Sequence, residues 1–226
     1  MNTNEPNEPV DELLAAAYAL DGPDANRALY ARWAATYDSG FIVDSGYRYH
    51  DQVAAVFRDR CAGSIGAGEA IVDVGCGTGL GGQALRRHAA FVIDGIDISP
   101  EMMQQAAAKQ AHGSPVYRRL IEADLTQTLP IGDHTYAGAL SVGTFTHGHV
   151  GPGALHEVVR IVRPGGRLAI GINAAHFASA GFAATFDQFL RDGRIAALEL
   201  TDVPIYEGGD TDDPDQIAHV ATFTVA

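Results

Sequence analysis

Short apolar runs alternate with polar or glycine-rich loops and with helical segments from Ile71 to the end of the chain. Runs of this length and composition predict β-strands buried in a parallel sheet. Strands are expected at 71–74, 91–97, 116–122, 135–142, 167–173, 196–206 and 217–225. The repeated order of strand, loop and helix predicts an α/β fold, with helices covering both faces of the sheet.

Local end signals place the helices of this repeat. Ser-Pro-Glu at 99–101 supplies an N-cap, a first-turn proline and a first-turn acid, so a helix is expected to begin there. Apolar residues between 153 and 162 follow helical spacing, and Arg-Pro-Gly-Gly at 163–166 stops that helix. Another helix is expected at 182–190.

The first part of the chain has a helical pattern and no strand signal. Residues 1–9 are mostly Asn, Glu and Pro, and we expect them to be frayed. Helices are expected at 10–20, from the turn at 21–24 to about 37, and at 49–61. We therefore expect a single domain over 10–226, with a helical cap or lid at 10–68 and an α/β core at 69–226.

Composition narrows the class of protein. The 226 residues are 46% hydrophobic, which suits one soluble globular domain, and no apolar run approaches the roughly 18 residues of a transmembrane helix. The start of the chain has no signal-peptide pattern. Cys61 and Cys76 form no disulfide framework, so a reducing, cytoplasmic location is expected.

The charge balance bears on partners. With 15 Lys+Arg against 28 Asp+Glu, the formal net charge is -13. A protein that grips nucleic-acid phosphates needs a basic face, and this balance leaves little to build one. We expect neither a nucleic acid nor a membrane as partner. Monomer and homodimer both stay open.

A glycine-rich turn follows the first predicted strand. Gly75, Gly77 and Gly79 alternate with other residues, and Asp97 ends the second predicted strand. Glycines allow the backbone to approach a ligand closely, and an acid about twenty residues further on can hold an adenosine ribose. A tight connection without a ligand would also need small residues. The spacing departs from the G-x-G-x-x-G of dinucleotide-binding proteins.

Asp73 followed by Gly75-x-Gly77-x-Gly79 resembles motif I of the class I S-adenosylmethionine-dependent methyltransferases. Asp97, Ala123-Asp124-Leu125 and the segment 163–168 (Arg-Pro-Gly-Gly-Arg-Leu) are similar to later motifs of that family, in the same order. The resemblance covers about 71–172. It implies a Rossmann-like, doubly wound, seven-stranded and mostly parallel sheet. The implied strand order is 3-2-1-4-5-7-6 with the last strand antiparallel.

The resemblance also implies roles for particular residues. Asp97 takes the ribose hydroxyls of S-adenosylmethionine, Asp124 accepts from the adenine amine, and the backbone of Leu125 pairs with a ring nitrogen. Asp73 supports the glycine turn by accepting backbone N–H bonds. The full set expected to bind the cofactor is Tyr37, Gly75, Cys76, Gly77, Asp97, Ile98, Met102, Asp124, Leu125 and Ser141.

The segment 141–150 (Ser-Val-Gly-Thr-Phe-Thr-His-Gly-His-Val) follows the fourth predicted strand, and in many relatives this loop faces the methyl acceptor. The sequence of this segment resembles that of the Williams–Beuren region methyltransferase-like subgroup. His147 is the candidate catalytic residue, as a general base on the acceptor side. Packing of one histidine with solvation of the other, or a His-x-His metal site, are the alternatives. No metal is expected, because the loop offers no convergent carboxylates.

Tyr30, Trp33 and Tyr37 are spaced to share one face of the second predicted helix. Many small-molecule relatives have a similar helix that closes over the cofactor, and an aromatic stripe packed into the core is the alternative. We expect an enzyme that transfers a methyl group to O or N of a small molecule. A protein methyltransferase of the same fold and a non-catalytic S-adenosylmethionine-binding protein are the competing hypotheses. Asn173 and His176 are candidate walls of the acceptor pocket.

Overall fold

The computed structural model describes residues 10–20, 22–210 and 212–226, so the expectation for residues 1–9 lies outside the described residues. One seven-stranded sheet has the order β5-β2-β1-β6-β7-β9-β8. Its strands are β1 (Ala70–Val74), β2 (Val92–Asp97), β5 (Tyr117–Glu122), β6 (Tyr136–Phe145), β7 (Val162–Asn173), β8 (Ile195–Pro204) and β9 (Ile217–Val225). Within this seven-stranded sheet, only the pairs of β9 with β7 and β8 are antiparallel. This confirms the expected order and the reversed last strand.

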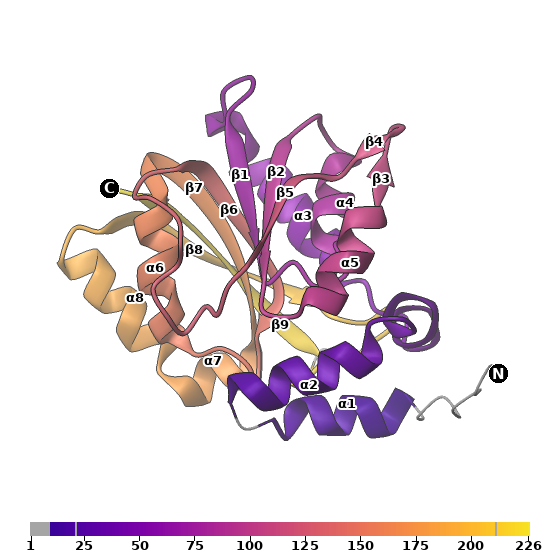
Figure 1. Cartoon of the computed structure of the whole chain (residues 1–226). Helices are drawn as coiled ribbons and strands as arrows, with labels where there is room; N and C mark the ends of the chain where they lie inside the picture. The colour runs from indigo at the N-terminus through magenta and orange to yellow at the C-terminus, as the bar shows by residue number, and fades with distance from the viewer. Residues whose placement is uncertain (1–9, 21, 211) are drawn as a thin grey trace.

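Helices cover both faces of the sheet (Figure 1). One face carries α3 (Tyr49–Arg60), α4 (Leu80–Arg86) and α5 (Pro100–Ala108), and the other carries α6 (Leu155–Ile161) and α8 (Phe182–Arg191). Each layer has its own apolar cluster, with Phe57 fully buried on the first face and Phe186 on the second. Burial of such side chains stabilises the layers by about 1.5–3 kcal/mol each.

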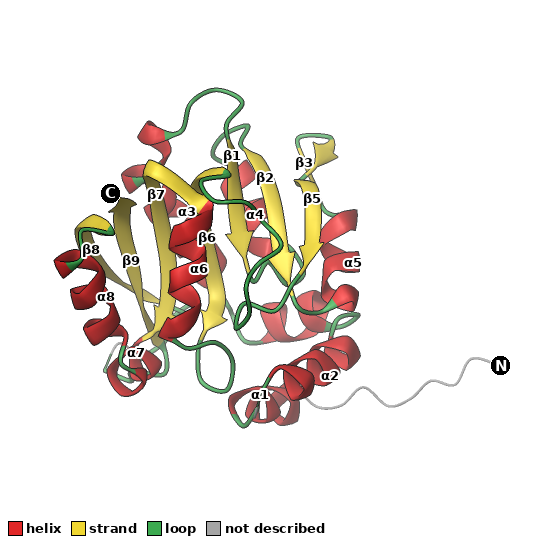
Figure 2. Ribbon diagram, turned by 60° about the vertical axis from the view of Figure 1, so that its left-hand side comes forward, coloured by secondary structure: helices red, strands yellow, loops and turns green. Residues whose placement is uncertain are grey.

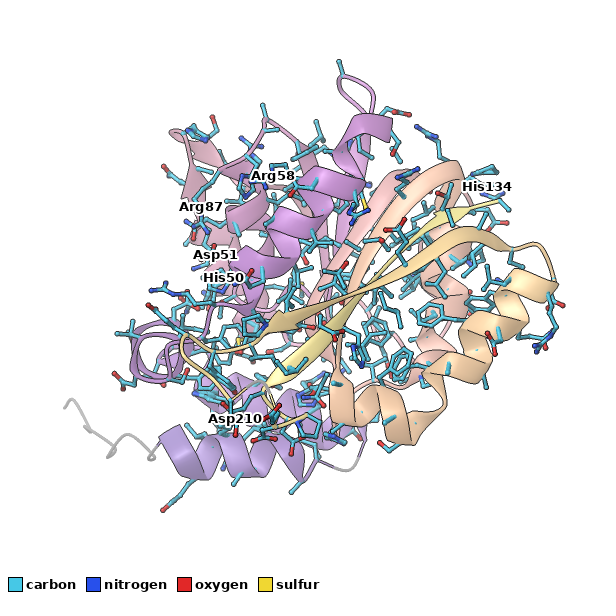
Figure 3. The ribbon with its side chains drawn as sticks, turned by 180° about the vertical axis from the view of Figure 1, so that it is seen from behind. His50, Asp51, Arg58, Arg87, His134 and Asp210 are labelled. Carbon is cyan, nitrogen blue, oxygen red and sulfur yellow. The ribbon has the colours of Figure 1, made fainter. Side chains whose placement is uncertain are left out.

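The packing divides the chain differently from the expected cap at 10–68. Helix α3 packs on the sheet and is part of the α/β core, because Val53, Ala54 and Phe57 have no measurable exposure and pack with residues of β1 and β7. The first turn of α3 is joined to the end of α4 by the ion pair between Asp51 and Arg87, which lie together beside His50 in Figure 3.

The helices that do form a cap are α1 (Val10–Tyr18) and α2 (Pro23–Trp33). In Figure 2 the arrowheads of β1, β2 and β5 point toward these two helices, which lie across the carboxyl ends of the strands. A third apolar cluster holds this layer together, consisting of Leu13, Ala17, Leu29, Trp33 and Phe41. The cap therefore closes the edge of the sheet at which α/β proteins bind ligands.

Several short elements were not expected from the sequence. The second predicted helix stops at Trp33, and a π-helical segment, η1 (Tyr37–Ile42), follows it. Helix α7 (Ala174–Ala180) begins directly after β7, and a small hairpin, β3 (Gln110–Ala111) with β4 (Ser114–Pro115), precedes β5. These elements are short, so hydrophobic periodicity carries little signal for them.

Candidate active site

A large cavity lies between the carboxyl ends of the strands and the cap. It holds about 1470 Å³ of space, counting its mouth to solvent. Of the residues expected to bind the cofactor, the lining contains Tyr37, Gly75, Cys76, Gly77, Asp97, Ile98, Met102, Asp124 and Leu125.

The glycine turn has a backbone that only glycine adopts easily. Gly75, Gly77 and Gly79 have φ values of 68°, 52° and 91°. A Cβ on Gly75 would stand 1.9 Å from Oγ1 of Thr144, whereas a Cβ on Gly77 would meet no atom within 4 Å. Gly75 is thus needed for packing against β6, and Gly77 leaves open space at the cavity wall, as close approach of a ligand requires.

Asp97 joins the end of β2 to the glycine turn. Its Oδ2 accepts from the backbone N–H of Gly77 at 2.7 Å, and its Oδ1 accepts from the N–H of Ser99 at 2.9 Å. Burial raises the pKa of this carboxyl, and the backbone N–H groups act in the opposite direction. A carboxylate held by backbone groups at the cavity wall is rigidly placed to accept from ligand hydroxyls.

Asp73 has a supporting position under the same turn. It is 1% exposed, and its Oδ2 accepts from the hydroxyl of Tyr117 at 2.6 Å. A backbone hydrogen bond from Gly82 in α4 also reaches this carboxyl. Burial outweighs both bonds and raises the pKa of Asp73 to about 6. The side chain thus connects β1 with β5 and α4.

Asp124 and Leu125 follow β5 and line the cavity beside Ala123. Oδ1 of Asp124 accepts from the backbone N–H of Thr126 at 2.8 Å and from its hydroxyl at 2.7 Å. Leu125 is buried in the apolar cluster of the α6 face. These contacts fix the loop after β5 so that it forms one wall of the cavity.

The cap supplies an aromatic wall. Ring contacts run from Tyr30 to Trp33 at 5.8 Å, on to Tyr37 at 4.9 Å, to Phe41 at 5.3 Å and to Tyr47 at 5.4 Å between centroids. All five rings line the cavity. The aromatic stripe therefore both packs the cap and faces the site, so the two alternatives for it are not exclusive.

Polar contacts hold the cap to the glycine turn. The hydroxyl of Thr78 donates to Oδ1 of Asp38 at 2.6 Å, and Nζ of Lys109 donates to the other carboxylate oxygen. Nε of Arg27 donates to the carbonyl of Ile98 at 3.3 Å. The sequence analysis did not predict these contacts of Asp38 and Thr78.

Ser141 and His147 do not line the cavity. Ser141 is fully buried within β6 and its hydroxyl donates to the carbonyl of Val74 at 2.7 Å, so it ties β6 to β1. His147 lies with Nε2 3.7 Å from Oδ1 of Asp215 and its ring against His176, at 5.1 Å between centroids. Of the two wall candidates, Asn173 lines the cavity and His176 does not.

His149 is the histidine of this loop that lines the cavity. The hydroxyl of Tyr30 lies 2.8 Å from Nε2 of His149, and Nδ1 lies 2.7 Å from the carbonyl oxygen of His147. A carbonyl only accepts, so Nδ1 carries the hydrogen and Nε2 accepts from Tyr30. Burial lowers the pKa of His149, which keeps the ring neutral.

Within residues 10–20, 22–210 and 212–226, no group of three or more His, Cys, Asp or Glu side chains has the arrangement of a metal site. Within the same residues no helix is both long enough and apolar enough to cross a bilayer.

Comparison with known proteins identifies the central part of the chain. Residues 72–170 match a family model described as a methyltransferase domain. The chain is 33% identical over 163 residues to human methyltransferase-like protein 27, covering 70% of this chain and 63% of the relative. It is 33% identical over 109 residues to the O-methyltransferase resE of Aspergillus sclerotiorum, covering 47% and 40%. The chain thus spans less than two thirds of the length of either relative.

A similar solved structure is the magnesium protoporphyrin IX methyltransferase of Synechocystis PCC 6803 with bound S-adenosylmethionine. The TM-score is 0.62 at 20% identity, over 92% of this chain and 98% of that one. At this identity the likeness concerns the fold. Residues 72–170 thus match a methyltransferase domain, and the sheet order of the chain is that of the class I S-adenosylmethionine-dependent methyltransferase fold.

Proposed function

We propose that the protein transfers a methyl group from S-adenosylmethionine to an oxygen or nitrogen atom of a small molecule. The observation that carries this proposal is the convergence of the glycine turn, Asp97, Asp124 and the aromatic wall on one cavity. A likeness of fold would not predict this convergence of particular side chains.

Each part of the cavity wall has a role in holding the cofactor. The open backbone of Gly75 and Gly77 receives its amino-acid part, and Asp97 accepts from its ribose hydroxyls. Ile98, Met102 and Leu125 enclose the adenine, whose amine donates to Asp124. Cys76 and Tyr37 complete the wall around the cofactor. When bound, the cofactor supplies an electrophilic methyl group on a sulfonium.

The chain itself contributes alignment and exclusion of water. Methyl transfer from a sulfonium is an in-line displacement, so holding the acceptor atom in line accounts for most of the rate gain. The cap covers the strand ends with the aromatic rings, and Asp38 holds it to Thr78. A covered cavity favours a small acceptor over a protein segment, which would need an open groove.

Compartment and partners follow from composition. Cys61 and Cys76 are both free and buried, as expected for a protein of a reducing compartment, and we keep the cytoplasm as its location. The net charge of -13 supports a partner other than nucleic acid.

The test has two steps on the full chain. Calorimetry with S-adenosylmethionine measures binding, and transfer of a labelled methyl group into an extract of small metabolites, and separately into an extract of proteins, measures activity. We expect binding and labelling of metabolites. Binding with label only in proteins would favour the protein methyltransferase, and binding with no label in either extract would favour a non-catalytic binding protein.

A further inference from the structure

The acceptor side of the cavity has a definite chemical character. Among the described residues that line the cavity there is no arginine or lysine. Burial lowers the pKa of His50 as well as that of His149, so neither ring supplies a positive charge. An acceptor with a carboxylate or phosphate would therefore lose its hydration without gaining a cationic side chain as partner, which disfavours its binding.

The apolar surface suits a flat ring. The aromatic wall defined by Tyr30, Trp33, Tyr37, Phe41 and Tyr47 continues to Tyr206, whose ring centroid lies 5.9 Å from that of Tyr47. Aromatic rings stack or meet edge to face at such spacings, and each pair adds attraction beyond the burial of apolar area. A planar acceptor can extend this series of contacts, whereas a flexible polar chain cannot.

His149 presents a basic atom to the same space. The carbonyl of His147 holds its Nδ1–H, so the lone pair of Nε2 is directed at a hydroxyl, which in this structure belongs to Tyr30. A base oriented by a third group and already bonded to a hydroxyl is the arrangement that general-base catalysis requires.

The loop that carries His149 is fixed against the cap. Gly148 has φ 74°, and a Cβ there would stand 2.9 Å from the carbonyl oxygen of Ala17 and 3.0 Å from the N–H of Leu20. His176 adds a contact from α7, where its Nε2 lies 3.1 Å from the carbonyl of Val150. The position of Nε2 of His149 is thus set by packing on both sides of the loop.

We propose that the acceptor is a neutral phenol, and that Nε2 of His149 is the base that removes the proton of its hydroxyl. This rests on the proposed methyltransferase function. The phenol hydroxyl takes the place that the Tyr30 hydroxyl holds on Nε2. The phenol oxygen gains the methyl carbon and gives its proton to Nε2. The electron pair of the broken carbon–sulfur bond stays on sulfur, and the proton then passes to water.

Binding is measured first, without turnover. The protein is loaded with S-adenosylhomocysteine and titrated by calorimetry with phenol, catechol and 2-naphthol, and with the acid counterparts 4-hydroxybenzoate and 6-hydroxy-2-naphthoate. We expect at least one phenol to bind about tenfold or more tightly than its acid counterpart, a difference of about 1.4 kcal/mol. Equal or reversed affinities, or no binding of any phenol, would overturn the acceptor class.

Turnover of the phenol that binds is then compared in two variants. His149→Gln is expected to lower kcat about 100-fold or more, the usual scale for a general base, with cofactor affinity unchanged. His147→Gln is the matched control from the same loop and is expected to stay within about threefold of the wild type. Equal turnover of the wild type and His149→Gln would sink the assignment.

Nitrogen NMR of the histidine rings gives a readout that does not depend on turnover. We expect hydrogen on Nδ1 and a lone pair on Nε2 of His149, with the His149→Gln variant assigning the signals. The opposite tautomer overturns the proposal. If the wild type labels metabolites other than phenols, only this inference fails. If it binds the cofactor and labels nothing, the proposed function fails with it.

Discussion

The two carboxylates that line the cavity beside the glycine turn, those of Asp97 and Asp73, have different hydrogen-bond partners. Asp97 accepts from the backbone N–H groups of Gly77 and Ser99, whereas Asp73 accepts from the hydroxyl of Tyr117. We propose that Asp97 binds the ribose and that Asp73 supports the turn.

Replacing Asp97 by Ala is expected to weaken S-adenosylmethionine binding by about 1–3 kcal/mol, because charge-assisted hydrogen bonds to the ribose are lost. Calorimetry checks this, and Glu122→Ala, which removes an exposed acid at the end of the adjacent strand β5, is the control. Unchanged affinity in a folded Asp97→Ala variant would contradict the ribose assignment.

Asp73 makes stability depend on pH. Its folded pKa of about 6 lies above the ordinary value of 3.8, so the native state holds more protons than the unfolded state between these values. Stability therefore falls as pH rises through this window, by about 3 kcal/mol for a shift of this size.

Urea unfolding between about pH 4 and about pH 7 tests this in the wild type and Asp73→Asn. The variant is expected to lack this loss, so the difference between the two proteins should change by about 3 kcal/mol over the range. Glu122→Gln controls for the removal of one negative charge. A constant difference would show that Asp73 is ionised at the same pH in both states.

At the scale of elements, two pieces of irregular backbone define the site. The glycine turn between β1 and α4 forms the floor, and the π-helical η1 brings Tyr37 and Asp38 over it. Neither follows regular helix or strand geometry, and both carry residues that line the cavity.

Two glycine substitutions distinguish the glycine that packing requires, Gly75, from the glycine that leaves space for a ligand, Gly77. Gly75→Ala and Gly77→Ala both place an alanine at positive φ, at a cost of about 1–2 kcal/mol. Gly75→Ala also overlaps Thr144, so it is expected to destabilise the fold more strongly. Gly77→Ala is expected to fold and to lose cofactor affinity. Thermal unfolding and calorimetry distinguish the two, and equal effects on both measurements would contradict this division.

The contact of Asp38 with Thr78 and Lys109 is expected to slow release of the cofactor. Asp38→Ala should raise the dissociation rate about tenfold or more, since charge-assisted bonds of this kind are worth about 1.5–3 kcal/mol when made only in the closed form. Trp33 is the sole tryptophan of the chain and lines the cavity, so its fluorescence follows release in a stopped-flow experiment.

The control for Asp38→Ala is Asp44→Ala, which removes an exposed acid just beyond η1. If both variants release the cofactor at the rate of the wild type, the contact of Asp38 with Thr78 and Lys109 does not control release.

At the scale of the whole molecule, the cavity belongs to no single segment. Its lining combines α1 and α2, the glycine turn, the loops after β2, β5 and β6, and the link from β8 to β9. The backbone of residues 46–48 bonds to that link, with the N–H of Arg48 donating to the carbonyl of Ile205 and that of Glu207 to Gly46. We infer that residues 10–226 act as one domain.

A ligand that contacts so many segments should stabilise the whole domain. S-adenosylmethionine at about one hundred times its Kd is expected to add about 2.7 kcal/mol, which raises the Tm of a chain of this length by about 5–11 °C. Thermal melts of the wild type check this, with Asp97→Ala at the same ligand concentration as the control. A wild-type Tm unmoved by the ligand would contradict cofactor binding at this cavity.

The sequence by itself determined the limits of most strands and helices, and the family resemblance supplied the strand order. The limits predicted for the last strand, 217–225, are those of β9, and the helix expected at 182–190 is α8 with one more residue. Such elements follow from periodicity and end signals within a few residues. The glycines and Asp97 are equally local, because a positive φ and a strand end each restrict which residue can stand there.

Only the tertiary structure decided the acceptor side. His147 and His149 are two residues apart in a loop without periodicity, and the path of the backbone at Gly148 against Ala17 turns one ring outward and the other into the cavity. Ser141 was expected to bind the cofactor from the fourth strand. Its hydroxyl instead donates to the carbonyl of Val74 in the neighbouring strand. Which side chain reaches a cavity depends on contacts between segments far apart in the chain, and no local pattern encodes those contacts.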